Sequence, residues 1–440
     1  MSVPAPLERI AAAHARLAPQ FAGGPAWARR REAALRTLVA RGLPDRRDEN
    51  WKYLDHARIG EYAFDSAPAA QLDRAAFAAR VLAVAGAHCV VLVDGRYDAQ
   101  LSATGTPAGL EVVDLAALIE RDPQAANAIL RTPGDLADDR FALLADAFAA
   151  GGVLIRIAAG RELAAPVYLV HVATAGAPAV HQTRVVVDVG AGGRCTLLEH
   201  FVVIGEATVL GNLAAELALG EGAAINHLRL HEHGPEAAQV ETWVVRAAAR
   251  SRYEQHLLAF GGRLLRSNLD LVLDGAHAAC RLDGLFLADG ERQVDLLTQV
   301  THRGAATETV QEYRGIATAR GRGAFNGRVT VEASARGSNA SQSSRNLLLS
   351  PLAEINARPQ LEINVDDVQC RHGATIGTLD DDHLFYLRSR GLDEAAARTL
   401  LTFAFCRDLI GRVPLAPVRD AAEALVAGAL PDRGLIRGAG

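Results

Sequence analysis

The sequence of 440 residues contains one lysine, Lys52, so nearly all of its 46 basic residues are arginines. A phosphate-binding P-loop needs a lysine that follows a glycine-rich turn, and Lys52 instead follows Glu49, Asn50 and Trp51. The chain therefore carries no Walker-A site of its own. A Schiff-base enzyme would also have to use Lys52, whose sequence context does not indicate an apolar pocket.

Cysteine is scarce, with five residues and no Cys-x-x-Cys pair, which predicts reduced thiols in the cytosol. No apolar run reaches the length of a membrane span, and Glu8 and Arg9 interrupt any signal-peptide core. Net charge is only −5 and aromatic residues make up 5%, which argues against a nucleic-acid surface. We therefore predict a cytoplasmic protein that contacts neither membrane nor nucleic acid.

Signatures of common enzyme classes are also missing, since neither G-x-S-x-G nor H-E-x-x-H occurs. The glycines of residues 321–327 lack the strand–helix context of a dinucleotide-binding turn and predict a turn between strands. The sequence therefore lacks the motifs of these hydrolase and dinucleotide-binding classes.

The pattern of apolar residues divides the chain into three regions. Residues 1–150 read as mostly helical, residues 151–368 as short strands separated by glycine, and residues 369–440 as helical again. In the last region Asp380 and Asp393 are suited to cap helices, and the second of these helices is expected over 394–410.

The middle region shows a weak repeat. Polar-then-apolar steps recur at His200, His227, His256 and Gly284, at spacings near the length of one coil of a β-solenoid. The sequence therefore predicts a mainly β protein whose core is a β-solenoid, in preference to a β-sandwich.

Near the end of the strand-rich region, Leu361, Ile363 and Val365 alternate with polar residues, as in a half-buried strand. If the strand continues, Cys370 and His372 project on the same side, about 7 Å apart at the backbone. A thiolate and an imidazole so placed can share a metal, although zinc and iron–sulfur sites normally need four ligands. The remaining ligands would come from elsewhere in the chain or from another subunit; the alternative is an inert cysteine beside a hydrogen-bonded histidine.

A second group of candidate ligands comprises His227, His231, Glu232 and His233. His231 and His233 could bind a metal from one strand face, but the flanking Gly234-Pro235 favours a solvated strand end. The remaining cysteines stand in apolar contexts and are expected to be small core residues: Cys89, Cys195, Cys280 and Cys406.

Three stretches near the C-terminus resemble the SufB/SufD family of iron–sulfur cluster assembly proteins. They are residues 341–350, the pair of segments 359–363 and 366–377, and residues 385–391. The segment 366–377 includes Asp366-Asp367-Val368-Gln369-Cys370-Arg371-His372-Gly373-Ala374. Residues 49–53, residues 94–96 and the total length are most similar to the SufD branch.

The resemblance implies a right-handed parallel β-helix with helical regions at both ends: residues 1–150, then a β-helix core over 151–368, then a C-terminal helical region over 369–440. It implies a non-catalytic scaffold subunit, and so not an enzyme, that helps to acquire iron and assemble the nascent cluster. Cys370 and His372 match the family's C-x-H-G-A motif and would hold iron or a transient cluster at an interface with SufB. Arg371 stands where the family usually has a small residue.

The resemblance also implies partners. The chain would pair with SufB and dock the ATPase SufC through its C-terminal region, for which the expected interface residues are Phe385, Tyr386, Arg390, Leu400 and Phe403. SufC would bind the ATP, and no tightly bound cofactor is expected in this chain. The sequence leaves open whether a homodimer forms when SufB is absent.

Three alternatives remain at this point. A β-helix enzyme acting on polysaccharide would show a carboxylate-rich groove with aromatic platforms. A SufB-like scaffold would accept persulfide sulfur on its own cysteine, with Cys195 or Cys280 as candidates. A purely structural partner would leave Cys370 and His372 inert.

Overall fold

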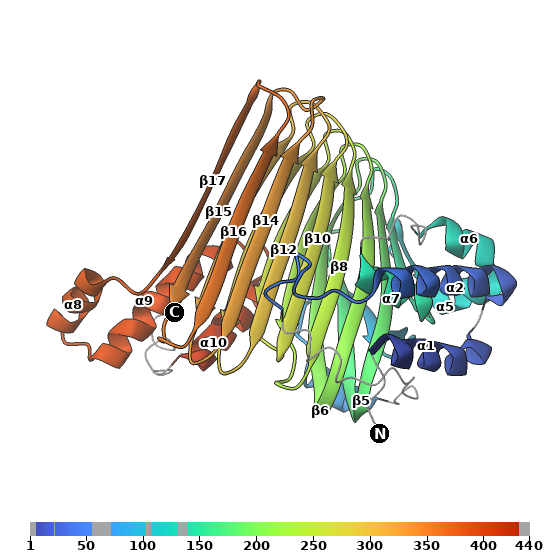
Figure 1. Cartoon of the computed structure of the whole chain (residues 1–440), viewed down its shortest axis with the longest axis horizontal. Helices are drawn as coiled ribbons and strands as arrows, with labels where there is room; N and C mark the ends of the chain where they lie inside the picture. The colour runs from blue at the N-terminus through green and yellow to red at the C-terminus, as the bar shows by residue number, and fades with distance from the viewer. Residues whose placement is uncertain are drawn as a thin grey trace.

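The computed structural model describes residues 6–21, 23–54, 72–102, 105, 107–130 and 139–430, and the side chains of 175–178 and 206–207 lie outside this description. The chain forms a parallel β-solenoid of about seven turns, with helices packed at both ends (Figure 1). The predicted fold class is confirmed.

Two sheets build the solenoid, and we call the space between them the lumen. The first sheet contains β1 (His88–Val93), the first parts of β5 (Val167–Val189) and β6 (Arg194–Leu219), β7 (Ala224–Glu232), β9 (Arg252–Ala259), β11 (Ala279–Ala288), β13 (Glu308–Ala317), β15 (Ser338–Leu348) and β17 (Val368–Gly377). The second sheet contains β4 (Gly152–Ile157), the last parts of β5 and β6, β8 (Ala238–Ala247), β10 (Leu264–Leu273), β12 (Gln293–His302), β14 (Arg322–Val331) and β16 (Glu354–Ile363).

The coil length is close to the repeat seen in the sequence, but the alignment of the repeat needs correction. Leu197 pairs with His227, which pairs with Gln255, while His200 pairs with Leu230 and not with His227. The connections between strands differ in length from coil to coil, so a constant spacing cannot track the register. The parallel pairing places every second residue of each strand in the lumen, where apolar side chains such as Phe201, Trp243 and Phe325 form the core.

The N-terminal region is not only helical, and the solenoid begins before residue 151. Strand β1 pairs with β5 in the first sheet, β2 (Arg96–Tyr97) pairs with β1, and β3 (Leu110–Asp114) runs antiparallel to β4. Strand β4 therefore has a partner on both sides, and β3 is the outermost strand of the second sheet at this end among the described residues.

Helices surround these first strands (Figure 1). Their bounds are α1 (Pro6–Leu17), the 3₁₀ helix η1 (Ala18–Gln20), α2 (Gly24–Arg41), α4 (Arg74–Ala78), α5 (Leu115–Arg121), α6 (Pro123–Ala128) and α7 (Arg140–Ala147). Ile10 of α1, Leu38 of α2 and Phe141 of α7 pack with Val240 and Leu264 of the second sheet, on its outer face.

At the other end, strand β17 runs to Gly377, so the boundary predicted at residue 368 is wrong. The last coil belongs to the solenoid because β17 pairs with β15 along its length. Helices α8 (Asp381–Ser389), α9 (Glu394–Ile410) and α10 (Ala416–Ala429) follow, and the predicted caps Asp380 and Asp393 each accept a backbone hydrogen bond. No helix in the described part of the chain is long and apolar enough to span a membrane.

Candidate site at the open end of the solenoid

Strand β17 is the last strand of the first sheet (Figure 1). Within the described ranges it pairs with β15 alone, so the backbone groups of its other edge have no strand partner. Most of its side chains are exposed. An edge strand of this length is a template for pairing with another chain.

Cys370 and His372 lie on the luminal side of β17, as the sequence predicts. Cys370 pairs with Ala340, which belongs to the luminal core, and Cys370 itself packs against that core. His372 pairs with Gln342, which is buried. Arg371 faces the opposite way, since its Nε donates to Ser341 Oγ at 3.1 Å. The open end of the lumen therefore presents a half-buried thiol and an exposed imidazole together.

The described part of the chain leaves the side chains of both Cys370 and His372 able to make further polar contacts. Partial burial raises the pKa of the Cys370 thiol, and a hydrogen bond with the Ala340 backbone acts in the opposite direction. No hydrogen bond or ion pair joins the His372 side chain to another described residue. A search of the described residues for three or more histidine, cysteine or carboxylate groups able to hold a metal finds none. Two ligands are thus present, and any further ligand must come from outside this part of the chain.

Polar side chains continue inward from His372. Gln342 Nε2 donates to Gln311 Oε1 at 3.3 Å, and Thr298 Oγ1 of the second sheet donates to the same oxygen at 2.9 Å. The lumen next to the candidate site is therefore polar on both sheets, unlike the apolar core that fills most of it.

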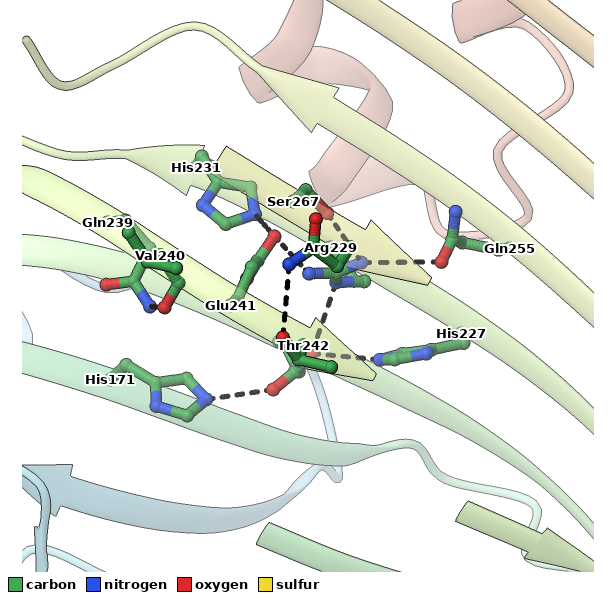
Figure 2. A network of polar contacts seen from close by, with 12 residues as sticks. His171, His227, Arg229, His231, Gln239, Val240, Glu241, Thr242, Gln255 and Ser267 are labelled. Atoms are coloured by element: carbon green, nitrogen blue, oxygen red, sulfur yellow. Dashed lines mark hydrogen bonds and ion pairs between the residues drawn. The ribbon is translucent and has the colours of Figure 1, made fainter. Parts of the chain in front are cut away.

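A larger polar network lies deeper in the lumen and is centred on Arg229 (Figure 2). Arg229 forms ion pairs with Glu241 and, at 3.5 Å, with Glu199. Glu199 accepts contacts from His171 and His227 at 2.9 Å each, and His231 lies 3.3 Å from Glu241. Arg229, Glu199, Glu241, His227 and His231 are completely buried. The interpretation of the histidine cluster as a solvated strand end is therefore wrong, because two of its members project into the lumen.

The charged groups of this network stabilise one another's ionised forms. Burial raises the pKa of Glu199, but hydrogen bonds from His171 and His227 prevail and lower it below its ordinary value. Burial opposes ionisation of Glu241 as well, yet the guanidinium of Arg229 and the imidazole of His231 lower its pKa to about 2. The same carboxylates outweigh burial and raise the pKa of Arg229. Two carboxylates and one guanidinium therefore stay charged inside the solenoid.

Sequence reasoning missed Glu199, Arg229 and Glu241. The sequence feature that could have revealed them is their position in the strand pattern. Leu197, Glu199 and Phe201 are at alternate positions of one strand, and Leu197 and Phe201 face the core, so Glu199 must face the core as well. The same alternation places Arg229 in the core-facing row of β7.

Three of the other cysteines are less accessible than Cys370. Cys195, Cys280 and Cys406 are buried, as predicted, while Cys89 is half-buried. Burial raises the pKa of Cys195, Cys280 and Cys406 to about 12 in each case. Their thiols are therefore protonated at neutral pH, which disfavours Cys195 and Cys280 as persulfide acceptors.

The predicted interface residues separate into two groups. Phe385 and Tyr386 on α8 are 75% and 55% exposed, Arg390 stacks over the Tyr386 ring at 5.2 Å, and Leu400 is half-buried. Phe403 is only 7% exposed and packs with the outer face of the first sheet, so it is unavailable to a partner. The face of α9 that contains Phe403 covers the solenoid.

Comparisons with known proteins agree on one family. Residues 171–405 match the model described as SUF system FeS cluster assembly, SufBD core domain, and residues 24–169 match the SufBD protein N-terminal region. The iron-sulfur cluster assembly protein SufD of Escherichia coli is 29% identical over 380 residues, which cover 85% of this chain and 86% of that protein. A SufBD family protein of Synechocystis sp. is 29% identical over 404 residues, 89% and 88% of the two chains. SufD of Bacillus subtilis is 26% identical over 276 residues, 61% of this chain and 62% of its own.

Proposed function

The chain belongs to the SufB/SufD family and is SufD-like, with a role in iron–sulfur cluster assembly by the SUF system, and we propose that it acts there as a non-catalytic scaffold subunit. In this proposal it pairs with SufB, docks the ATPase SufC, and supplies Cys370 and His372 to iron or to a nascent cluster. The observation that carries the proposal is the joint placement of these two side chains at the open end of the lumen.

An incomplete ligand set supports pairing with a second scaffold. Cys370 and His372 together supply two ligands, whereas zinc and iron–sulfur sites normally need four. The unpaired edge of β17 offers main-chain groups to a strand of another subunit, which would bring that subunit's ligands to the same place. SufB is the proposed partner, and the site would be complete only in the complex.

The chemistry at Cys370 fits transient binding. Because burial raises the pKa of its thiol, Cys370 holds its proton at neutral pH, and a bound iron must displace that proton. Binding is then weaker than at a preformed thiolate site, and a cluster assembled here is easier to pass on. His372 would contribute a neutral imidazole nitrogen as the second ligand.

Docking of SufC would use α8. Phe385 and Tyr386 are large exposed hydrophobic side chains on neighbouring positions of this helix, and such anchors are typical of protein interfaces. SufC would bind and hydrolyse ATP, since this chain has no Walker-A lysine.

The proposal is tested with His372→Ala in a complex reconstituted with SufB and SufC. We expect iron content and cluster yield to fall at least about tenfold, because removal of even an indirect metal partner typically costs that much. Gln369→Ala is the matched control, since Gln369 is exposed on β17 and occupies the alternate row that faces away from the lumen.

The control should keep the yield of the unaltered complex. If His372→Ala assembles with SufB and SufC and keeps its iron and cluster yield, the proposed role of the site is refuted. If the complex does not form with the unaltered chain, the proposed partners are refuted instead.

A further inference from the structure

The single lysine of the chain lines a cavity of about 200 Å³ on the outer face of the second sheet. One wall is the segment that follows α2, with Arg46, Lys52 and Tyr53. The floor consists of residues near the beginnings of three neighbouring strands, β12, β14 and β16: Gln293, Val294, Arg322, Gly323, Ala324, Glu354 and Asn356. The cavity thus joins residues that are far apart in the sequence.

The segment that carries Lys52 is fixed on the sheet by contacts on both sides of the lysine. Trp51 is buried and stacks on Phe141 with ring centroids 5.1 Å apart, and Leu54 is buried in the same cluster. Gln293 of β12 donates a hydrogen bond to the carbonyl oxygen of Tyr53. Lys52 itself lies over the Tyr53 ring, with its Nζ 4.8 Å from the centroid. The lysine is therefore placed by rigid neighbours and not by its own contacts.

The cavity carries an excess of positive charge. Arg46, Lys52 and Arg322 contribute three cations, and Glu354 is the one carboxylate among the lining residues. Arg322 lies 4.0 Å from Glu354, and the amide of Asn356 also donates to that carboxylate at 2.8 Å. Within the described chain, neither Arg46 nor Lys52 forms an ion pair with a carboxylate. Two cationic side chains thus face the cavity without a counter-charge.

We propose that this cavity binds a small anion with two or more negative charges, carried by phosphate or carboxylate groups. Guanidinium groups bind both kinds of oxyanion through paired hydrogen bonds, and an ammonium adds a point charge. The volume is below the range of about 300–1,000 Å³ that encloses a drug-sized ligand, so the occupant is a small molecule or the charged group of a larger one. The proposal does not depend on the proposed scaffold function, because the cavity lies on the outside of the second sheet and Cys370 and His372 lie on the luminal side of the first.

Titration calorimetry of the full chain at low ionic strength tests the site, with inorganic pyrophosphate and tricarballylate as separate probes. Saturable binding of pyrophosphate alone assigns the site to phosphate groups, and binding of tricarballylate alone assigns it to carboxylates. Binding of both supports a general anion site. Failure of both probes to bind overturns the proposal.

Substitutions then locate the site. Lys52→Gln and Arg322→Gln should each weaken binding by about tenfold or more, since hydrogen bonds to charged groups are worth that much. Glu354→Gln should strengthen it, because it removes the opposing charge. Arg47→Gln is the matched control: it removes the same charge from an exposed neighbour of Arg46 that does not line the cavity. Equal weakening by Arg47→Gln and Lys52→Gln would show only general attraction to a basic surface and would overturn the proposal.

Discussion

The lumen of the solenoid has a closed part and an open part, and both contain polar residues in the same core-facing row. In the closed part Arg229, Glu199 and Glu241 are completely buried, and Arg229 forms ion pairs with both carboxylates. At the open end Cys370 is half-buried, and the exposed His372 side chain has no hydrogen-bond or ion-pair partner among the described residues. The polar residues of both parts face the lumen. Those in the closed part have charged or hydrogen-bonding partners in the protein, and His372 at the open end has none among the described residues.

This difference separates a structural role from a binding role. Charges taken out of water are tolerated when they are paired, and removal of one partner leaves the other unpaired in the interior. Arg229 forms ion pairs with Glu241 and Glu199, and two histidines donate hydrogen bonds to Glu199. Ion pairs and hydrogen bonds together therefore stabilise this part of the lumen. The polar groups at the open end do not need protein partners because water reaches them, which is compatible with the proposed binding role.

The largest contrast is expected in cysteine reactivity. Cys195, Cys280 and Cys370 all occupy the core-facing row, but burial raises the pKa of Cys195 and Cys280 to about 12. Three pKa units above the ordinary value lower the thiolate fraction about a thousandfold. Burial raises the pKa of Cys370 as well, but this thiol is only half-buried, so the two buried thiols should react at least about tenfold more slowly than Cys370. Timed alkylation of the native chain with iodoacetamide, followed by peptide mass spectrometry, measures the three rates. Similar rates for Cys370 and Cys280 would contradict the division into closed and open parts; labelling in urea, where all should react alike, is the control.

The next largest effect is expected on stability in the closed part. Arg229→Met leaves two buried carboxylates without their guanidinium, and we expect it to lower the free energy of unfolding by about 3–5 kcal/mol. Arg246→Met on β8 is the matched control: Arg246 is 53% exposed and pairs with Asp274, so its loss should cost less than about 1 kcal/mol. Urea unfolding followed by circular dichroism gives both values. A shift for Arg229→Met no larger than that for Arg246→Met would mean that the buried network contributes little.

Acid should act on the closed part in a defined range of pH. His302, whose ring nitrogens contact Thr307 and Thr309 at 2.7 and 2.8 Å, is buried, and burial lowers its pKa to about 4. Between pH 6.5 and about 4 the unfolded chain binds a proton there that the folded chain does not, so stability is lost as the pH falls. The loss amounts to about 3 kcal/mol for this residue.

The measurement is the urea midpoint as a function of pH for the unaltered chain and for His302→Gln. The variant should show a shallower slope between pH 6.5 and 4. Below that range both proteins should lose further stability, because the lowered pKa of Glu241, about 2, means that its stabilising charge is lost as the pH falls toward that value. Identical slopes between pH 6.5 and 4 would show that folding does not lower the pKa of His302.

Sequence patterns predicted the strands and helix ends better than the polar contacts inside the lumen. Strand periodicity, helix caps such as Asp380 and Asp393, and the shared side of Cys370 and His372 follow from local rules, and the structure confirms them. The Arg229 network was missed because its members lie on different strands, and their proximity depends on a register that the variable connections hide. The expectation that Phe403 contacts a partner was wrong because its burial depends on how α9 packs on the first sheet, which local sequence patterns do not determine.

The smallest effect is expected at the open end, where loss of a side chain should leave the fold intact. His372→Ala removes an exposed imidazole, so the free energy of unfolding should change by no more than about 0.5 kcal/mol. His302→Ala, which breaks two buried hydrogen bonds, should cost about 2 kcal/mol or more under the same conditions near pH 7. Thermal and urea unfolding of the isolated chain measure both changes. A large loss for His372→Ala would show that this histidine supports the last coil, and a fall in cluster yield could then no longer be ascribed to a missing ligand.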